Sequence, residues 1–444
     1  MKHKLQPLLA CLLVAVTALC LPSHHAMARS IPPIIRDAEI EETLYRLTAP
    51  VFDAAGIGRN DVRMILLEDP DLNAFVAGGQ NIFLYTGVIL EAENPGELVG
   101  VLAHETGHIA GAHLVRTQQA LEDASFQTIV ATILGAAAAA ATGHGGAASA
   151  VFSGGTTLAQ QGLMAHSRTQ EASADQAAVK YLSDAGYNAN GLLSFLEKLQ
   201  AQEVLPSSRR SEYLYTHPLT TNRISFLENK VRQTAHKPSQ NAAAQESFKR
   251  MQAKLTGYIY PDLALKYPGD TIADRYARTI AYYRKSDFKK ALTEADKLIA
   301  AEPDNPYFLE LKAQMLFESG EAAASLPPYA RAVELAPQSG LIRANYGQSL
   351  LADNQYEAAI TQLERSLRSE NRSPLIHRLL ATAYGRLDDQ AASRVHLAEE
   401  ALLQRQYDDA RRQAGLATQL MDKSHSKWLR LQDIRAFLDS LPAR

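Results

Sequence analysis

A chain of 444 residues, 46% hydrophobic and 21% charged, has enough apolar surface for two or three globular cores, which excludes disorder as the default state. Its formal net charge of −3 gives no reason to expect a nucleic-acid partner. The 2 cysteines, Cys11 and Cys20, both lie in the first 28 residues. The rest of the chain therefore has no cysteine for a disulfide or a metal site, and any metal must be bound by histidine and carboxylate side chains.

The first 28 residues have the pattern of a secretory signal peptide. Lys2 and Lys4 precede an apolar stretch from Leu8 to Leu21, and the sequence AMA, ending at Ala28, is a small-x-small cleavage site. We predict export to the periplasm and cleavage after Ala28, which removes two lysines and changes the formal charge from −3 to −5. An uncleaved membrane anchor is the alternative, but the apolar stretch is shorter than the roughly 20 residues that span a bilayer.

A helix and then a small antiparallel sheet are expected after the signal peptide. Ile35, Ile40, Leu44 and Leu47 recur at helical spacing behind two prolines. Three short β-rich runs follow, separated by turn residues. These runs are Val62–Leu67, Ala74–Ala77 and Ile82–Tyr85.

A second helix is predicted to start at Asn94. Asn94 can cap it, proline suits the first helical position, and Glu97 can complete a capping box. This helix carries the sequence LVGVLAHETGHIAGAHL.

The predicted helix contains an HExxH motif. His104 and His108 are four residues apart and therefore project from one face, close enough to share a metal ion. Glu105 flanks that face, where a general base would lie. The motif alone is only moderately specific, but its place in a capped helix of an exported protein favours a zinc site.

A second acidic segment supplies the remaining candidates for metal binding. Glu171 and Asp175 lie on one face of a polar helix that is expected to end near Gly186. Hydrolytic zinc takes three protein ligands and keeps a fourth position for water, so Glu171 is the predicted third ligand. Asp175 is expected to accept a hydrogen bond from a ligating histidine and to fix its tautomer. An ordinary solvated helix face is the alternative.

The sequence THPLTTNRI is the third candidate segment. His217 precedes Pro218 and is therefore held in extended backbone, and Arg223 opens a new helix after a threonine cap. Either side chain can stabilise the oxyanion of a tetrahedral intermediate. In an alternative hypothesis, His217 occupies the open zinc position and keeps the enzyme at rest. A purely structural role is the usual one for a lone histidine or arginine.

Two further segments separate these motifs from the end of the chain. Ile129–Ala141 is alanine-rich and apolar, and Gly143–Gly155 is glycine-rich. This region is either a buried or hairpin helix with a loop, or a lid or peripheral membrane element; it is too short to span a bilayer. Gln233–Gln245 loses hydrophobic periodicity and is the predicted linker.

The sequence repeats with a period of 34 residues beyond about Pro268. Several positions recur at this interval: Pro303 and Pro337, Phe308 and Ile342, Leu316 and Leu350, and Phe288, Ala322 and Tyr356. Pro374 follows after 37 residues, and the pattern restarts at Tyr407. We expect about four tetratricopeptide hairpins and a terminal helix through Trp428 and Phe437. A generic helical bundle is the alternative.

In the combination of its motifs, the chain resembles the periplasmic β-barrel assembly-enhancing proteases. The features that carry the resemblance are the signal peptide, the sequence NAFVAGGQNIFLYTG, the AHETGHIAGAH helix, EASAD, THPLTTNRI and the repeats. The assembly-enhancing proteases are gluzincin metallopeptidases related to the prenyl-protein and HtpX-type proteases. The resemblance implies an α+β gluzincin-like domain, mostly helical with a small antiparallel sheet, followed by an all-α tetratricopeptide solenoid. The expected boundaries are 1–28 for the signal peptide, 29–232 for the peptidase, 233–267 for the linker and connecting helix, and 268–444 for the repeats.

The resemblance also implies one zinc ion held by His104, His108 and Glu171, with Glu105 as general base and Asp175 and His217 in the site. Zinc would lower the pKa of water, and Glu105 would pass its proton to the leaving amine. His217 or Arg223 would help to carry the negative charge.

We expect the substrate to add as a strand near residues 73–77. The implied function is quality control of outer-membrane proteins: unfolded or misassembled ones would be degraded, and the repeats would bind the β-barrel assembly machinery. The alternative is a tetratricopeptide chaperone or scaffold with a closed zinc site. A membrane-embedded protease is disfavoured because no long apolar span is present.

Overall fold

The computed structural model is mostly helical with one small sheet, which confirms the expected fold class. The described residues are 32–59, 61–113, 115–117, 167–202, 211, 213–234 and 242–441. The predicted signal peptide and the segments Ile129–Ala141 and Gly143–Gly155 lie outside them. No helix among the described residues is both long and apolar enough to cross a membrane.

A two-residue strand comes before the first helix. β1 (Ile34–Ile35) precedes α2 (Ala38–Ala54), and the Asp37 side chain caps α2 by accepting hydrogen bonds from two amides of the first turn. The prediction that Ile35 belongs to the helix is wrong, because Ile35 pairs with Leu66 in the sheet. The helical spacing of apolar residues begins only after the capping aspartate.

The sheet is mixed, which corrects the expected antiparallel arrangement. Its strand order is β1-β2-β4-β3, formed with β2 (Arg63–Leu67), β3 (Ala74–Ala77) and β4 (Asn81–Tyr85). The hairpin through Gly78 and Gly79, with φ of 59° and 97°, makes β4 antiparallel to β3. β4 then lies between β3 and β2 and runs parallel to β2. Alternation of apolar residues indicates the buried face of a strand but not the direction of its neighbour.

The helix with the HExxH motif is α4 (Pro95–Ala110), preceded by α3 (Thr86–Glu91). The Asn94 side chain caps α4, as predicted. Glu97 does not complete the capping box: it accepts a hydrogen bond from the Glu93 amide at 3.2 Å and pairs with Lys198 at 3.0 Å. The buried carboxylate of Glu97 is instead paired with a cation, Lys198, from a distant part of the chain.

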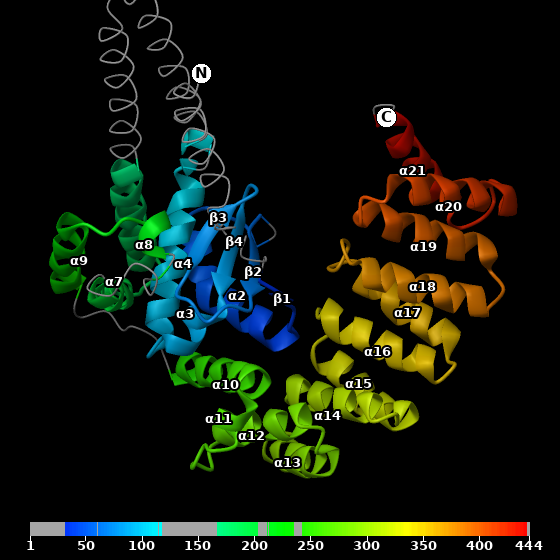
Figure 1. Ribbon diagram of the computed structural model, residues 1–444, viewed down its shortest axis with the longest axis horizontal. Coiled ribbons are helices and arrows are strands. Elements are labelled where there is room, and N and C mark those ends of the chain that lie inside the picture. The colour runs from blue at the N-terminus through cyan, green and yellow to red at the C-terminus, as the bar shows by residue number, and fades with distance from the viewer. Residues whose placement is uncertain are drawn as a thin grey trace, which may run out of the picture. The chain divides into compact units, whose positions relative to one another are not determined.

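The core of the peptidase part lies between the sheet, α2 and α4 (Figure 1). Leu44 of α2, Ile82 of β4 and Leu102 of α4 are fully buried in one apolar cluster. The remaining helices of this part are residues 167–184, α7 (Asn190–Gln202), α8 (Tyr213–Thr216) and α9 (Thr221–Thr234). Residues 167–184, which we call the Glu171 helix, confirm the predicted polar helix ending near Gly186.

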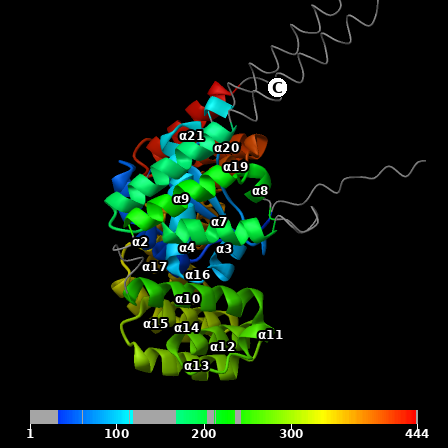
Figure 2. The same cartoon turned by 90° about the vertical axis from the view of Figure 1, so that its left-hand side faces the viewer.

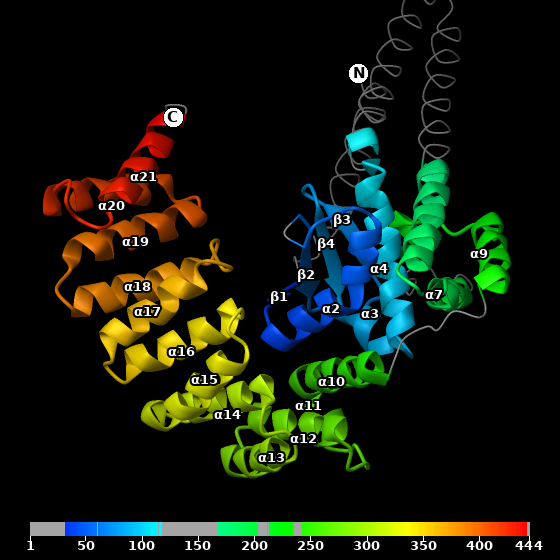
Figure 3. The same ribbon diagram turned by 180° about the vertical axis from the view of Figure 1, so that it is seen from behind.

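The carboxy-terminal part is a series of antiparallel helical hairpins (Figure 3). Its helices are α12 (Ile272–Arg284), α13 (Phe288–Ala301), α14 (Pro306–Glu318), α15 (Ala322–Leu335), α16 (Gly340–Ala352), α17 (Tyr356–Ser366), α18 (Pro374–Arg386), α19 (Gln390–Leu403), α20 (Tyr407–Leu420) and α21 (Trp428–Ser440). Among the described residues, α12 to α19 form the four expected hairpins, and α21 is the expected terminal helix.

The 34-residue register is unbroken through Pro374, which refines the sequence analysis. The helices α14, α16 and α18 begin at residues 306, 340 and 374, and α13, α15, α17 and α19 begin at 288, 322, 356 and 390. Pro374 is therefore equivalent to Pro306 and not to Pro337. The turn inside each hairpin repeats as well, because Ser286, Gly320, Asn354 and Asp388 all have positive φ.

The 18-residue helix α10 (Ala242–Ile259) and the single-turn helix α11 (Pro261–Ala264) connect the peptidase part to the repeats. The predicted linker Gln233–Gln245 includes the last turn of α9 and the first turn of α10. α10 packs on α12 through alanines (Figure 2), and its Gln252 side chain donates to the carbonyl of Ile89 at 2.9 Å.

A buried lysine on α10 binds the beginning of α2. Lys254 is 3% exposed, and its Nζ lies 2.8 Å from Asp37 Oδ2 and 3.2 Å from Glu39 Oε2. The Tyr276 hydroxyl of α12 donates to the same Glu39 carboxylate at 2.7 Å. Burial alone would lower the pKa of Lys254, but the negative charges of Asp37 and Glu39, together with Tyr276 and Glu310, outweigh burial and raise the pKa well above its ordinary value. Lys254 is therefore charged and held by two carboxylates.

We predict that Lys254→Ala lowers the free energy of unfolding by roughly 3–5 kcal/mol, because it leaves buried carboxylates without their cation. Lys249→Ala, at an exposed position of the same helix, is the control and should change stability by less than about 0.5 kcal/mol. Thermal and denaturant unfolding of the two variants measure the difference. Equal midpoints would show that the buried contact adds nothing to stability.

Candidate metal centre

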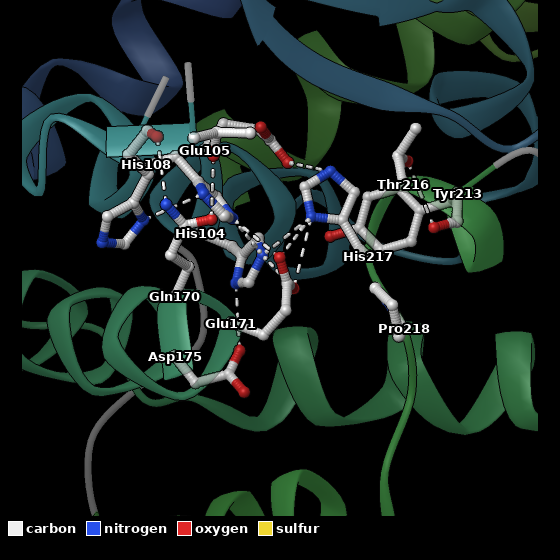
Figure 4. A network of polar contacts seen from close by, with 12 residues as sticks. His104, Glu105, His108, Gln170, Glu171, Asp175, Tyr213, Thr216, His217 and Pro218 are labelled. Carbon is white, nitrogen blue, oxygen red and sulfur yellow. Dashed lines mark hydrogen bonds and ion pairs between the residues drawn. The ribbon is translucent and has the colours of Figure 1, made fainter. Parts of the chain in front are cut away.

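α4 brings both histidines of the HExxH motif to one point. His104 is fully buried and His108 nearly so, and their Nε2 atoms lie 3.0 Å apart. Figure 4 shows both rings beside Glu171, which rises from the opposite helix. Two ring nitrogens bound to one zinc ion at about 2.1 Å in tetrahedral geometry would lie roughly 3.4 Å apart, close to this separation.

Glu171 joins both histidines from the Glu171 helix. One carboxylate oxygen lies 3.3 Å from His104 Nε2 and the other lies 3.3 Å from His108 Nε2. Gly107 allows this approach, because a Cβ at that position would lie 2.8 Å from the backbone oxygen of Ala174. The two helices therefore pack at a distance that only glycine permits on the α4 side.

His217 brings a fourth donor to the same point. Its Nδ1 lies 3.2 Å from Glu171 Oε1 and 3.4 Å from His104 Nε2. One donor atom from each of the four residues lies within 4.8 Å of all the others. The Tyr213 ring stacks on His217 with centroids 4.3 Å apart, so the imidazole has a fixed wall on one side.

Asp175 and Arg223 form a buried pair behind the histidines. Asp175 Oδ1 lies 3.0 Å from His104 Nδ1, in the position expected of a carboxylate that orients a ligating histidine. Arg223 binds Asp175 through Nε at 2.7 Å and Nη2 at 2.9 Å, and its Nη1 lies 2.9 Å from Glu171 Oε2. The Arg223 guanidinium therefore faces the two carboxylates.

Glu105 lies in the site with both carboxylate oxygens buried. Neither oxygen has a hydrogen-bond partner among the described residues, and His217 Nε2 is 3.6 Å from Oε1. Burial raises the pKa of Glu105, although the nearby histidines His217 and His104 act in the opposite direction. Burying a carboxylate without a hydrogen-bond partner costs free energy, so the position of Glu105 points to a polar molecule or ion that binds beside it.

The pKa values of the donor set are strongly perturbed. Burial alone would lower the pKa of His104, but its hydrogen bonds to Asp175 and Glu171 raise it to about 9. Burial would raise the pKa of Glu171, but its hydrogen bonds to His104 and the other two histidines hold it well below its ordinary value. Burial would also raise the pKa of Asp175, but its hydrogen bonds to His104 and Arg223 lower it. The carboxylates of Glu171 and Asp175 therefore stay ionised and favour a positive charge between the histidine rings.

The charge balance of the site also favours a cation. A bound metal ion would displace the proton from His104, and the imidazoles would then be neutral. In that state the carboxylates of Glu105, Glu171 and Asp175 contribute three negative charges and Arg223 contributes one positive charge, which leaves two negative charges. A divalent metal ion would balance them. Four convergent nitrogen and oxygen donors, this charge and the unpartnered Glu105 carboxylate all fit a metal ion.

All seven residues predicted for the site come together, and the structure adds Tyr213, His113 and Gln170. The Tyr213 hydroxyl is buried without a hydrogen-bond partner in the described part of the chain. Its position four residues before His217 was the available signal, since a helical turn places such residues side by side. His113 is the last residue of the AHETGHIAGAH stretch, but the predicted helix includes it together with His108, whereas α4 ends at Ala110. Gln170 directly precedes Glu171, and no motif marks it.

We predict that Gly107→Ala weakens metal binding and lowers stability by roughly 1–3 kcal/mol, because the new methyl group forces the Glu171 helix away from α4. Gly415→Ala is the control: it is also helical, but nothing lies within 4 Å of its added Cβ. It should be neutral or stabilising by up to about 1 kcal/mol. Metal content and thermal unfolding check both, and an unchanged metal content in Gly107→Ala would contradict the packing argument.

The chain is similar to several proteases. The β-barrel assembly-enhancing protease of Yersinia pestis is 26% identical over 382 residues, covering 82% of this chain and 77% of that protein. That of Escherichia coli strain K12 is 24% identical over 351 residues, covering 76% of this chain and 70% of that protein. The mitochondrial metalloendopeptidase OMA1 of Schizosaccharomyces pombe is 25% identical over 213 residues, covering 48% of this chain and 59% of that protein. The expected resemblance is confirmed.

Among solved structures, MamA of Desulfovibrio magneticus RS-1 matches 37% of this chain and 92% of its own, with 20% identity and a TM-score of 0.31. The tetratricopeptide repeat family model matches residues 316–383, and that of peptidase family M48 matches residues 35–231. The M48 match spans the HExxH helix, the Glu171 helix and the His217 segment. Residues 35–231 thus match the model of peptidase family M48, and the chain is a metallopeptidase that also carries tetratricopeptide repeats.

Proposed function

We propose that the chain is a periplasmic zinc metalloendopeptidase that degrades misassembled outer-membrane proteins and assists the assembly of others. The observation that carries the proposal is the convergence of His104, His108, Glu171 and His217 on one point, with Glu105 beside it. The names of the relatives supply the link to β-barrel assembly.

His104, His108 and Glu171 would hold the zinc ion. Two imidazoles and one carboxylate are a usual ligand set for catalytic zinc, and no cysteine lies beyond position 20 to offer another. When bound, zinc would polarise the scissile carbonyl and lower the pKa of water towards neutrality. Asp175 would hold the His104 ring, and Arg223 would hold Asp175 and Glu171 in place.

Glu105 is the proposed general base. Its carboxylate has no competing hydrogen bond among the described residues, and burial raises its pKa, which brings it closer to that of a base acting near neutral pH. It would take a proton from the attacking water and deliver it to the amine that leaves. The proton then passes from water to product through one side chain.

His217 would alternate between two positions. With its Nδ1 among the other donors, it completes a four-residue set and closes the site to water. When it moves away from this point, the fourth position opens and its ring can donate to the developing oxyanion. Arg223 suits that second role less well than His217, because its donors already face Asp175, Glu171 and the Pro218 carbonyl.

The substrate is proposed to bind along β3, which is an edge strand of the sheet next to β4. An extended segment can add to such an edge through backbone hydrogen bonds, which selects unfolded or unpaired β segments. Outer-membrane β-barrel proteins that have not closed expose such segments. The repeats would bind the assembly machinery, because repeat solenoids present extended binding surfaces.

We predict that Glu105→Gln keeps its metal but cleaves an unfolded outer-membrane protein at least about 100-fold more slowly, because the base is lost and the ligands remain. His217→Ala should keep the metal and cleave faster than wild type if His217 closes the site. Metal content and cleavage by the purified mature chain measure both effects. A wild type that holds metal but cleaves nothing, and is not activated by His217→Ala, would instead favour a repeat scaffold with a closed site.

A further inference from the structure

A fourth histidine, His113, contacts the metal centre on the side of His108 that faces away from the other donors. His113 is 3% exposed, and its Nδ1 lies 3.0 Å from the Nδ1 of His108. The opposite nitrogen of His108, Nε2, faces His104 and Glu171. His108 therefore lies between His113 on one side and the other donors on the other.

The chain reverses sharply to bring His113 back. α4 ends at Ala110, and Ala112 has a φ of 49°, in the left-handed region that alanine rarely adopts. A Cβ at Gly111 would lie 2.3 Å from the His113 ring, so glycine makes room for this ring. The positive φ of Ala112 and the close contact between Gly111 and the His113 ring show that the surrounding structure holds His113 against His108.

The same turn is tied to the second metal-binding helix. The Gln170 side chain donates to the carbonyl of His113 at 3.0 Å and accepts from the Thr117 hydroxyl at 3.1 Å. Gln170 directly precedes Glu171. The backbone that carries His113 is thus fixed to both helices that supply metal donors.

We propose that His113 is a positioning residue that sets the tautomer of His108. The inference rests on the proposed function, since it concerns the same metal centre. One proton lies between the two Nδ1 atoms. For His108 Nε2 to present a lone pair to a metal ion, His108 must carry this proton on Nδ1 and donate it to His113 Nδ1. His113 then carries its own proton on Nε2.

Asp175 and His113 have equivalent tasks in this arrangement. Asp175 Oδ1 lies 3.0 Å from Nδ1 of His104, as His113 Nδ1 does from Nδ1 of His108. Each histidine of the HExxH motif thus has its own acceptor behind it. A neutral imidazole behind His108 adds no further negative charge to a site that already holds three carboxylates.

The test compares three substitutions of His113. Asparagine places its side-chain oxygen near the position of Nδ1, whereas glutamine reaches the position of Nε2. We expect His113→Ala and His113→Gln to lower the zinc affinity of the full chain roughly 10- to 100-fold, and His113→Asn to recover most of it. Competition with a chromophoric chelator measures the affinity without any need for cleavage, and circular dichroism checks that each variant folds.

Gly111→Ala provides a second route to the same effect. Gly111 has an ordinary helical φ of −74°, and the three atoms nearest to an added Cβ all belong to the His113 ring, so the main effect of alanine is to displace that ring. Gly111→Ala should weaken zinc binding in the wild type and have no further effect in His113→Ala. Equal affinities for wild type and His113→Ala, or an equal loss in the Asn and Gln variants, would overturn the inference. A wild type that binds no metal would instead overturn the proposed function.

Discussion

The close packing of α4 against the Glu171 helix is the constraint on which the site depends. Two histidines on consecutive turns of one helix can share a metal only if a third donor reaches them, and Glu171 comes from a helix more than sixty positions along the chain. Gly107, between the two histidines, removes the side chain that would separate the helices. Gly107 is therefore a packing residue. The close approach of the two helix backbones that it allows brings Glu171 within reach of His104 and His108.

This packing buries a set of charges that must be balanced. Asp175 and Arg223 pair through two hydrogen bonds, and Arg223 also contacts Glu171. Removing such groups from water costs several kcal/mol each, and a bidentate pair offsets part of that cost. The negative charge that remains is directed at the space between the histidines, where a divalent cation would offset it. The buried pair and the metal thus stabilise each other.

Helical periodicity in the sequence was sufficient to place His104 with His108 on one helical face and Glu171 with Asp175 on another. The prediction that the two faces meet came from the need of a catalytic metal for a third ligand and from the family resemblance. The sequence was also sufficient for the repeats, since the 34-residue period recurs in every helix start from α13 to α19. It was insufficient where the outcome depends on contacts between distant segments. The direction of β2 relative to β4, the pairing of Glu97 with Lys198 and the return of His113 to His108 are all of this kind. Local propensity carries no information about them.

The position of His217 has a consequence for selectivity in the proposed function. A closed site with four protein donors admits substrate only when His217 leaves, and a substrate can shift that equilibrium only by as much as it prefers the open state. Binding along β3 can supply this preference, because each backbone hydrogen bond to the edge forms only with a segment that has a free edge of its own. A closed barrel has no such edge and leaves the site shut. Discrimination between assembled and misassembled proteins then follows from backbone pairing, without any recognition of side-chain sequence.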